Sequence, residues 1–312
     1  MPRPQVDGIV NLDKPLDATS MDMVRLAKRL TRVKRVGHAG TLDPIATGVL
    51  LICFGQATRL MELLVEGRKV YKAQLRLGVA TDTHDAYGKP VAEADPSGAT
   101  REQLEALLPQ FTGDIRQQPP MYSALKREGK RLYDLARAGV EVERAEREVT
   151  VYRLELLEWE PPLATIEAEC GRGLYMRTLA HDMGAALGCG AYLNALVRLR
   201  SGAFRVEEAL SPQQFQEAVD EERWEELVKP LDTALLDMAP VVAEPAAERY
   251  LRSGQPVALR SDDEAKHLET RRAYAADGRF LGLVRFNRSQ GVWQPEKLFT
   301  LPNPSPHAPS GA

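Results

Sequence analysis

The chain has 312 residues, of which 44% are apolar and 27% charged, so it is long enough for one large and one smaller globular domain. No apolar stretch follows the basic residue near its beginning, and the longest apolar run, residues 49–54, is too short to cross a bilayer. These features argue against secreted and membrane proteins. We expect a cytoplasmic protein with no membrane partner.

The cysteines and histidines give no sign of a disulfide framework or a metal centre. Cys53, Cys170 and Cys189 lack disulfide or metal-ligand spacing, and an odd number of cysteines argues against a framework of disulfides. The five histidines are scattered, without cysteines or carboxylates at ligand spacing. We therefore expect free thiols in a reducing compartment and no metal site.

The net charge of −3 and isoelectric point near 6.1 argue mildly against a nucleic-acid-binding protein, because such proteins usually oppose phosphate with positive charge. The charges are segregated, however. Basic residues crowd segments 25–35 and 126–137, whereas acidic residues crowd segment 217–226. Such a chain can present one basic face, although two solvated helix surfaces would explain the same pattern.

The first half of the chain mixes strand and helix patterns. Residues 69–78 alternate with the period of a half-buried strand, with Tyr71 on the apolar face. Thr100 and Gln103 make a capping box for a helix. In chain order we expect a strand at 8–12, a helix that begins after Thr19 or Ser20, a glycine-punctuated loop at 37–48, a buried strand at 49–54, a helix at 57–64, the strand at 69–78, a helix ending near 108 and an extended segment at 117–120.

The second half changes character past Asp237. Before it we expect strands at 149–157 and 164–170, a helix at 175–187, a strand at 192–199 and a helix opened by Ser211-Pro212. After it come a linker at 239–242, a short helix, small strands between 256 and 299 with a hairpin at Asp277-Gly278, and a disordered tail at 302–312. Strands and helices without regular alternation predict an α+β fold with a mixed or antiparallel sheet flanked by helices.

The loop at 37–48 carries one carboxylate, Asp43, just before the buried strand. Its glycines allow another chain or a ligand to approach closely, and Pro44 restrains the backbone after Asp43. A reactive group on a loop rooted in a rigid strand suits catalysis. Since Asp-Pro is also common in turns, these residues alone leave a purely structural turn open.

Five motifs, in order along residues 8–204, resemble the TruB family of pseudouridine synthases. They are Asn11-Leu12-Asp13-Lys14-Pro15, Gly40-Thr41-Leu42-Asp43-Pro44, Val70-Tyr71-Lys72-Ala73, Pro119-Pro120-Met121-Tyr122-Ser123-Ala124-Leu125-Lys126 and Cys170-Gly171-Arg172-Gly173-Leu174-Tyr175-Met176-Arg177. Five ordered motifs are far more specific than one short pattern. Three positions depart from the family pattern: Ala39, Val197 and His181.

The resemblance implies a domain division. Residues 1–238 would form a pseudouridine synthase catalytic domain, with an RNA-gripping insertion at about 112–149. Residues 239–301 would form a small, β-rich, PUA-like RNA-binding domain, on the weaker evidence of motifs at 254–257 and 278–282. A β module that merely stabilises the larger domain is the alternative for this part.

The resemblance also implies the roles of individual residues. Asp43 is the expected nucleophile, and Arg177 would keep it ionised. Tyr71 would stack on a uridine that has left its helix and would handle a proton, although an ordinary core tyrosine is the default for its position. The other expected substrate contacts are His38, Tyr175 and Leu196, and the expected RNA contacts are Lys14, Lys28, Arg29, Lys126 and Lys130.

The implied reaction is the isomerisation of uridine 55 in the T stem-loop of tRNA to pseudouridine, which needs no cofactor or metal. The short, uncharged tail favours a stand-alone enzyme without guide RNA, and we expect a monomer; a role in tRNA folding could accompany catalysis. A non-catalytic RNA-binding module is the main alternative. A retaining glycosidase is a further one, but it needs a second carboxylate that the sequence does not reveal.

Overall fold

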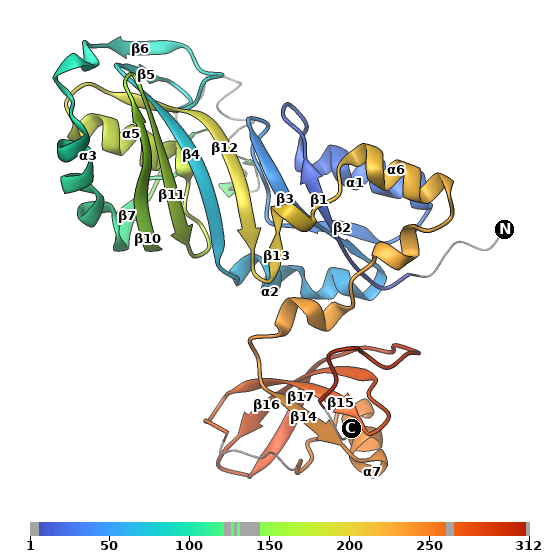
Figure 1. Ribbon diagram of the computed structural model, residues 1–312. Helices are drawn as coiled ribbons and strands as arrows, with labels where there is room; N and C mark the ends of the chain where they lie inside the picture. Colours follow the sequence, from blue (N-terminus) through green and yellow to red (C-terminus); the bar gives the residue numbers. More distant parts are fainter. Residues whose placement is uncertain (1–5, 122–125, 128–129, 132–143, 260–264, 310–312) are drawn as a thin grey trace.

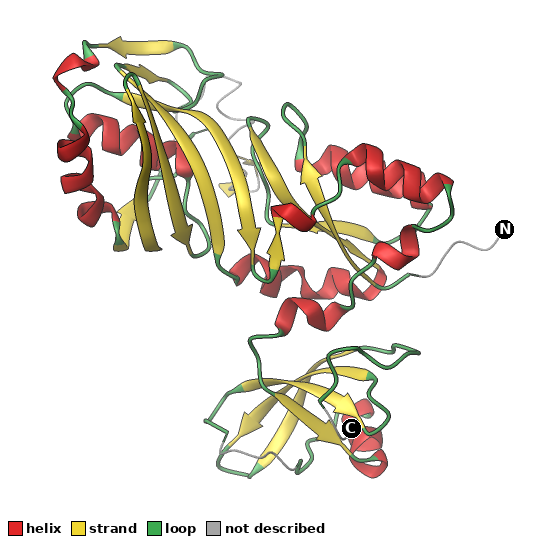
Figure 2. Ribbon diagram, viewed as in Figure 1, coloured by secondary structure: helices red, strands yellow, loops and turns green. Residues whose placement is uncertain are grey.

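The computed structural model describes residues 6–121, 126–127, 130–131, 144–259 and 265–309. It shows a large domain built on a mixed β-sheet with helices beside it, joined to a smaller β-rich domain at the C-terminal end (Figure 1). The α+β fold predicted from the sequence is confirmed. In Figure 2 the yellow strands of the large domain form one continuous, strongly twisted sheet.

The strands of the large sheet are β1 (Gly8–Lys14), β2 (Val36–Ala39), β3 (Ala46–Phe54), β4 (Lys69–Leu77), β7 (Gly113–Gln117), β10 (Arg147–Glu160), β11 (Leu163–Cys170), β12 (Ala191–Ser201) and β13 (Phe204–Arg205). Their order is β1-β3-β12-β4-β11-β10-β7, with β2 paired to β3 and β13 to β12. The β3–β12 pair is parallel and the other pairs are antiparallel. The sheet is therefore mixed, and the parallel pair lies at the strand that follows Asp43.

The second half of strand β3 is apolar throughout because other elements cover both of its faces. Every second residue from Leu50 to Phe54 packs with α1 (Ser20–Thr31) and α6 (Pro212–Asp220). The intervening residues, from Val49 to Cys53, face the 3-10 helix η1 (Gly55–Leu60) and the smaller domain. Successive side chains of a strand point to opposite faces, so burial on both sides requires apolar residues throughout.

The other end of the sheet has its own apolar cluster. Residues of β4, β11 and β12 pack there with α5 (Met176–Ala186), α3 (Arg101–Leu107) and the 3-10 helix η3 (Leu108–Phe111). The alternation in β4 is as predicted, since Ala73, Leu75 and Leu77 are buried. A short β5 (Val79–Thr81) pairs with β6 (Pro90–Glu93) beyond this end.

Local signals account well for the helix starts. The capping box predicted for α3 is present, and Thr19 rather than Ser20 caps α1, with Asp22 completing a second capping box. The helix expected at 57–64 consists of η1 followed by α2 (Met61–Glu66). Loop 37–48 is shorter than expected, because β2 takes its first residues and β3 begins at Ala46.

The remaining short elements complete the large domain. The 3-10 helices are η2 (Pro96–Gly98), η4 (Val206–Glu208), η5 (Trp224–Leu227) and η6 (Leu231–Leu235), and the hairpin β8 (Lys126–Arg127) and β9 (Lys130–Arg131) lies within the expected insertion. Most of that insertion, including the motif residues 122–125, lies outside the described residues.

The smaller domain is a sheet of β14 (Pro240–Ala243), β15 (Thr270–Ala275), β16 (Phe280–Asn287) and β17 (Val292–Leu298), in that order, with α7 (Pro245–Arg252) packed against it. The hairpin at Asp277-Gly278 joins β15 to β16, as predicted. Segment 239–242 was expected to be a linker, and this was wrong. Most of it belongs to β14, which pairs in parallel with β15 and buries Val241 and Ala243.

The two domains share an apolar cluster. Tyr274, Phe280 and Phe299 of the smaller domain pack with residues of β1, β3 and η1 of the larger one. Hydrogen bonds reinforce this contact, since Gln56 donates to and accepts from Thr300, and Arg59 donates to the Leu298 carbonyl at 2.6 Å. The smaller domain is therefore anchored to η1, in an apolar cluster that extends to strand β3.

The tail does not follow its prediction of disorder over the part that the structure describes, residues 302–309. Ser305 donates to the buried Asp232 at 2.5 Å, the His307 ring lies 3.0 Å from the Thr233 hydroxyl, and Pro304 bridges to Arg279. Composition suggested disorder, but these polar contacts and the packing of Ala308 hold the segment on the domain boundary.

Two further observations concern the cysteines and the lengths of the helices. Cys53, Cys170 and Cys189 are free and buried. Among the described helices, none is long and apolar enough to pass through a membrane.

At Gly48 of β3, the backbone of β12 approaches closely. The φ of Gly48 is +96°, and an added Cβ would lie 2.3 Å from the Arg198 carbonyl oxygen. Gly188 also has positive φ, +79°, but open space around it. We predict that Gly48→Ala lowers the free energy of unfolding by more than about 3 kcal/mol, because strain and a backbone clash add. Gly188→Ala should cost about 1 kcal/mol, from the backbone alone. Urea unfolding of both variants checks this, and equal losses would contradict the proposed close packing.

Candidate active site

The loop that carries Asp43, residues 40–45, is held at several points. The Leu42 N–H donates to the Ser20 hydroxyl at 2.8 Å, and that hydroxyl donates back to the Leu42 carbonyl at 3.2 Å. The Pro44 carbonyl accepts from the Asp17 N–H at 2.9 Å. Both neighbours of Asp43 are thus fixed to the β1–α1 region, which restricts where its carboxylate can point.

A buried arginine meets this carboxylate. Arg177 Nε donates to Asp43 Oδ2 at 2.8 Å, and Nη2 donates to Oδ1 at 3.3 Å. The Arg177 side chain is 4% exposed and that of Asp43 is 35% exposed. A two-pronged, charge-assisted pair fixes the orientation of the carboxylate, and the exposure leaves Asp43 within reach of a ligand. The pairing of Asp43 with Arg177 expected from the sequence is present.

Arg177 also faces the turn between β5 and β6. Its Nη1 donates to the Thr83 carbonyl at 3.3 Å and lies 3.6 Å from Asp85 Oδ2. Asp85, only 6% exposed, accepts in turn from the Thr83 hydroxyl and the Tyr87 N–H. The guanidinium therefore lies between two carboxylates, of which only Asp43 faces open space.

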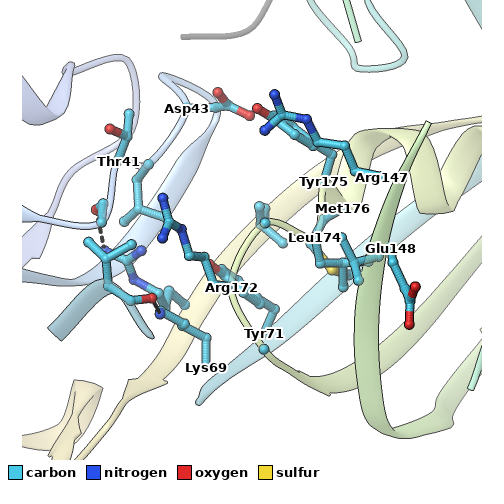
Figure 3. A pocket seen from close by; sticks show the side chains of 18 residues that line it. Thr41, Asp43, Lys69, Tyr71, Arg147, Glu148, Arg172, Leu174, Tyr175 and Met176 are labelled. Atoms are coloured by element: carbon cyan, nitrogen blue, oxygen red, sulfur yellow. Dashed lines mark hydrogen bonds between the residues drawn. The ribbon is translucent and has the colours of Figure 1, made fainter. Parts of the chain in front are cut away.

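That space is a cavity of about 530 Å³. Asp43 enters from the β2–β3 loop, Tyr71 from β4, and Leu174, Tyr175 and Met176 from the start of α5 (Figure 3). Leu196 of β12 completes the apolar wall. Of the predicted site residues, the structure thus brings Asp43, Tyr71, Tyr175 and Leu196 around one cavity, while Arg177 supports Asp43 from behind.

Tyr71 lies beside a second buried arginine, Arg198. Burial raises the pKa of the Tyr71 hydroxyl, and the nearby Arg198 guanidinium opposes that rise. Arg198 is 1% exposed, and it donates to the Val49 carbonyl at 2.6 Å and the Gly40 carbonyl at 3.1 Å. It therefore joins the loop before Asp43, strand β3 and the floor of the cavity. Tyr71 is a neutral phenol at ordinary pH.

Positive charge surrounds the cavity. Lys69, Arg147, Arg172 and Arg198 all line it, against Asp43 and Glu148 (Figure 3). Lys69 is 5% exposed, donates to the Val65 and Gly67 carbonyls, and has its pKa lowered to about 8 by burial. Arg172 is exposed and pairs with Glu66. Such a lining suits an anionic ligand.

His38 stands apart from the residues that line the cavity. It lies on β2 opposite Ile52 of β3, and burial, aided by Arg198, lowers the pKa of its ring. An uncharged imidazole beside the loop is compatible with packing against a displaced base, but its position as a substrate contact stays a prediction.

The predicted RNA contacts have mixed outcomes. Lys28 and Arg29 are exposed at the end of α1. Lys14 is not an RNA contact in this structure, because it is fully buried and donates to the carbonyls of Pro15, Ala18 and Pro44. Burial lowers its pKa to about 8, against the opposing effect of Asp43. The side chains of Lys126 and Lys130 lie outside the described residues.

Three functional features were missed from the sequence: the buried Asp85 behind Arg177, the clamp formed by Arg198, and Lys69 in the cavity wall. A charged residue at an apolar position of a strand was the available signal for Arg198. Nothing in the sequence pattern linked Asp85 to Arg177, since the two are far apart along the chain.

Comparisons with known proteins identify the family. The model of the TruB family pseudouridylate synthase N-terminal domain matches residues 28–176, and that of the tRNA pseudouridylate synthase B C-terminal domain matches residues 177–236. The chain is similar to proteins named tRNA pseudouridine synthase B from Cupriavidus metallidurans (42% identity, covering 96% of each chain) and Dechloromonas aromatica (44% identity, 95% of this chain and 97% of the relative).

Solved structures share the fold. A Cbf5-Nop10-Gar1 complex superposes with a TM-score of 0.73 at 24% identity, covering 97% of this chain and 87% of the other. An H/ACA RNP bound to a substrate RNA containing 2′-deoxyuridine gives 0.72 at 22% identity, with the same coverage. The family models define the class of protein as a pseudouridine synthase. With relatives above 40% identity over nearly its whole length, the chain belongs to the TruB family.

The buried Arg198 allows a test of how the loop is held. We predict that Arg198→Met lowers the free energy of unfolding by about 2–4 kcal/mol, because it removes the side-chain donor from the buried Val49 carbonyl and from the partly buried Gly40 carbonyl. Arg200→Met, two residues away on the same strand, removes only a partly exposed pair with Glu169 and should cost less than about 1 kcal/mol. Urea unfolding of the two variants is the measurement. Similar small losses in both would mean that Arg198 does not hold the loop.

Proposed function

We propose that the protein converts uridine 55 in the T stem-loop of tRNA to pseudouridine, with Asp43 as the nucleophile. The observation that carries the proposal is the partly exposed Asp43 carboxylate, held by the buried Arg177 at the edge of a cavity. The names of the relatives support tRNA as the substrate.

The chemistry requires one bond to break and another to form without any change in composition. The uracil N1–ribose C1′ bond breaks, the base turns, C5 bonds to C1′, the C5 proton leaves and N1 acquires a proton. A fixed carboxylate can hold one fragment covalently while the other turns. Asp43 suits this role because its loop is restrained on both sides and its charge is balanced by Arg177.

A uridine within a folded RNA must leave its stack to reach Asp43. Tyr71 offers an aromatic face, and base stacking of this kind contributes about 1–3 kcal/mol. Because burial raises the pKa of its hydroxyl, Tyr71 would pass on or donate a proton as a phenol, rather than act as a resident phenolate base. Tyr175 and Leu196 would then enclose the extruded base.

The arrangement bears on the alternatives. A retaining glycosidase needs a second carboxylate about 5 Å from the nucleophile, facing the same sugar. The other carboxylate that lines the cavity, that of Glu148, points away from Asp43 in Figure 3, and Asp85 is buried beside Arg177. A binding module without catalysis would not need a restrained, ionised carboxylate in its cavity.

We further propose that the enzyme acts in the cytoplasm as a monomer without guide RNA, and that the smaller domain contacts the tRNA.

The decisive prediction concerns Asp43→Asn. The variant should fold, because Arg177 keeps Asp85 as a partner, and it should bind tRNA, but its turnover should fall at least about a thousand-fold. Product at position 55 of an unmodified tRNA transcript is mapped by carbodiimide labelling, and binding by filter retention. Asp220→Asn, on the exposed face of α6, is the control and should behave like wild type. Normal turnover by Asp43→Asn would refute the nucleophile assignment; conversion at another position would refute the target.

A second prediction concerns the basic cluster at the end of α1. Replacing Lys28 and Arg29 by glutamine should weaken tRNA binding and make its dependence on salt shallower by about two units of slope, because each phosphate contact releases counterions. Arg223→Gln, whose partner is Glu221, serves as the control with an unchanged slope. Binding by the double variant that equals wild type at every salt concentration would place this cluster outside the RNA interface.

A further inference from the structure

Two histidines from distant parts of the chain stack on one another behind the Asp43–Arg177 pair. The rings of His84 and His181 lie 3.9 Å apart between centroids and 2° from parallel. His84 belongs to the β5–β6 turn and His181 to α5, and the proposed chemistry uses neither. His181 is also one of the positions where the sequence departs from the family pattern.

Both rings are connected to Arg177. His181 lies four residues after Arg177 on α5, so the two side chains share a helix face. His84 lies directly between Thr83, whose carbonyl accepts from Arg177, and Asp85, whose carboxylate faces it. The backbone at His84 is left-handed, with φ of +63°, a conformation that few non-glycine residues adopt. The stack therefore joins the helix that carries Arg177 to the turn that receives it.

The surroundings favour an uncharged His84 ring. The Nδ1 atoms of both histidines are buried and have no hydrogen-bond partner among the described residues. Arg177 on α5 and Arg144 near the start of β10 bring positive charge, and the Nη1 of Arg144 is engaged with the Pro119 carbonyl. The negative groups nearby are Asp82 and Asp85 on the turn and Asp182 on α5. Asp85 is already occupied by Arg177 and by the turn itself.

We propose that the stacked rings of His84 and His181 form a positioning unit that keeps the Thr83 carbonyl and Asp85 against Arg177, and thereby keeps Arg177 aimed at Asp43. The unit acts through Arg177, so its two members are positioning residues. The inference rests on the proposed roles of Asp43 and Arg177.

Acid should weaken this unit. Burial first, and then His181, Arg177 and Arg144, lower the pKa of His84 to about 4. Because the pKa of the folded state lies below the ordinary value near 6.5, the unfolded chain binds the proton more readily. The stabilising effect is thus complete above about pH 6.5 and is lost progressively as the pH falls towards 4.

Three variants test the unit at pH 7.5. His84→Asn removes the ring but keeps a residue that tolerates left-handed backbone, and it should lower kcat about tenfold with KM for tRNA within about twofold. His181→Phe keeps an aromatic ring and should stay within about threefold of wild type. The double variant should be no worse than His84→Asn alone, because partners in one unit are not additive. His267→Asn, an exposed histidine of the smaller domain, is the control.

The same variants are then compared across pH 4.5–8 by kinetics and by urea unfolding, which shows that each is folded. In His181→Phe, the acid-side fall of kcat should move to higher pH by at least about half a unit, and the acid-side fall of the unfolding midpoint should be smaller, relative to wild type and His267→Asn. Because His181 lowers the pKa of His84, its removal lets His84 bind a proton at higher pH and brings the folded pKa closer to that of the unfolded chain.

Any one of three results would overturn the proposal. Wild-type kcat in His84→Asn, additive losses in the double variant, or superimposable acid limbs for wild type and His181→Phe would each show that the rings only fill space. Asp43→Asn separates this from the proposed function. Normal turnover by Asp43→Asn would refute the nucleophile assignment. Failure of the histidine test would refute only the positioning unit, because it leaves the result expected for Asp43→Asn unchanged.

Discussion

The ion pair between Asp43 and Arg177 is the interaction on which the site depends. Arg177 is almost fully buried, so its charge must be balanced within the protein, while Asp43 must remain open to a ligand. The two demands are met because Asp43 lies at the edge of the cavity and Asp85 supplies further negative charge from behind. The result is a carboxylate that is paired with a buried arginine and yet accessible from the cavity.

The sheet keeps the Asp43 carboxylate at the edge of the cavity because it fixes the loop that carries it. Arg198 of β12 reaches the carbonyls on both sides of the loop, and Gly48 lets the β12 backbone approach β3 closely. Buried Lys14 holds the Pro44 carbonyl from the opposite side. Two strands distant from the loop in sequence, β12 and β1, therefore hold carbonyls in or beside it, and neither needs to touch the substrate to influence where Asp43 points.

Much of the fold could be predicted from local patterns. The apolar run before Phe54, the alternation around Tyr71 and the capping box at Thr100 each depend on residues close together in sequence. Predictions failed where long-range contacts decide. Pro240 suggested a linker, but pairing with β15 makes a strand, and the proline-rich segment after 302 is ordered by Asp232, some seventy residues earlier in the chain.

The candidate site shows the same division. Asp43, Tyr71 and Arg177 could be named because each stands in a recognisable motif. Lys14 also stands in a motif, but the fold buries its side chain, which the sequence could not reveal. A residue expected to contact RNA at the surface therefore binds backbone carbonyls in the interior. The stacking of His84 on His181 joins a turn to a helix almost a hundred residues later, so no local pattern could have indicated it.

The apolar cluster shared by the two domains has a consequence for how the chain can be divided. Tyr274, Phe280 and Phe299 belong to one cluster with apolar side chains of η1, η6 and strand β3. A shortened chain ending at residue 238 would uncover part of this cluster to water, and would invite self-association. The two domains must accordingly be expressed and engineered as one piece.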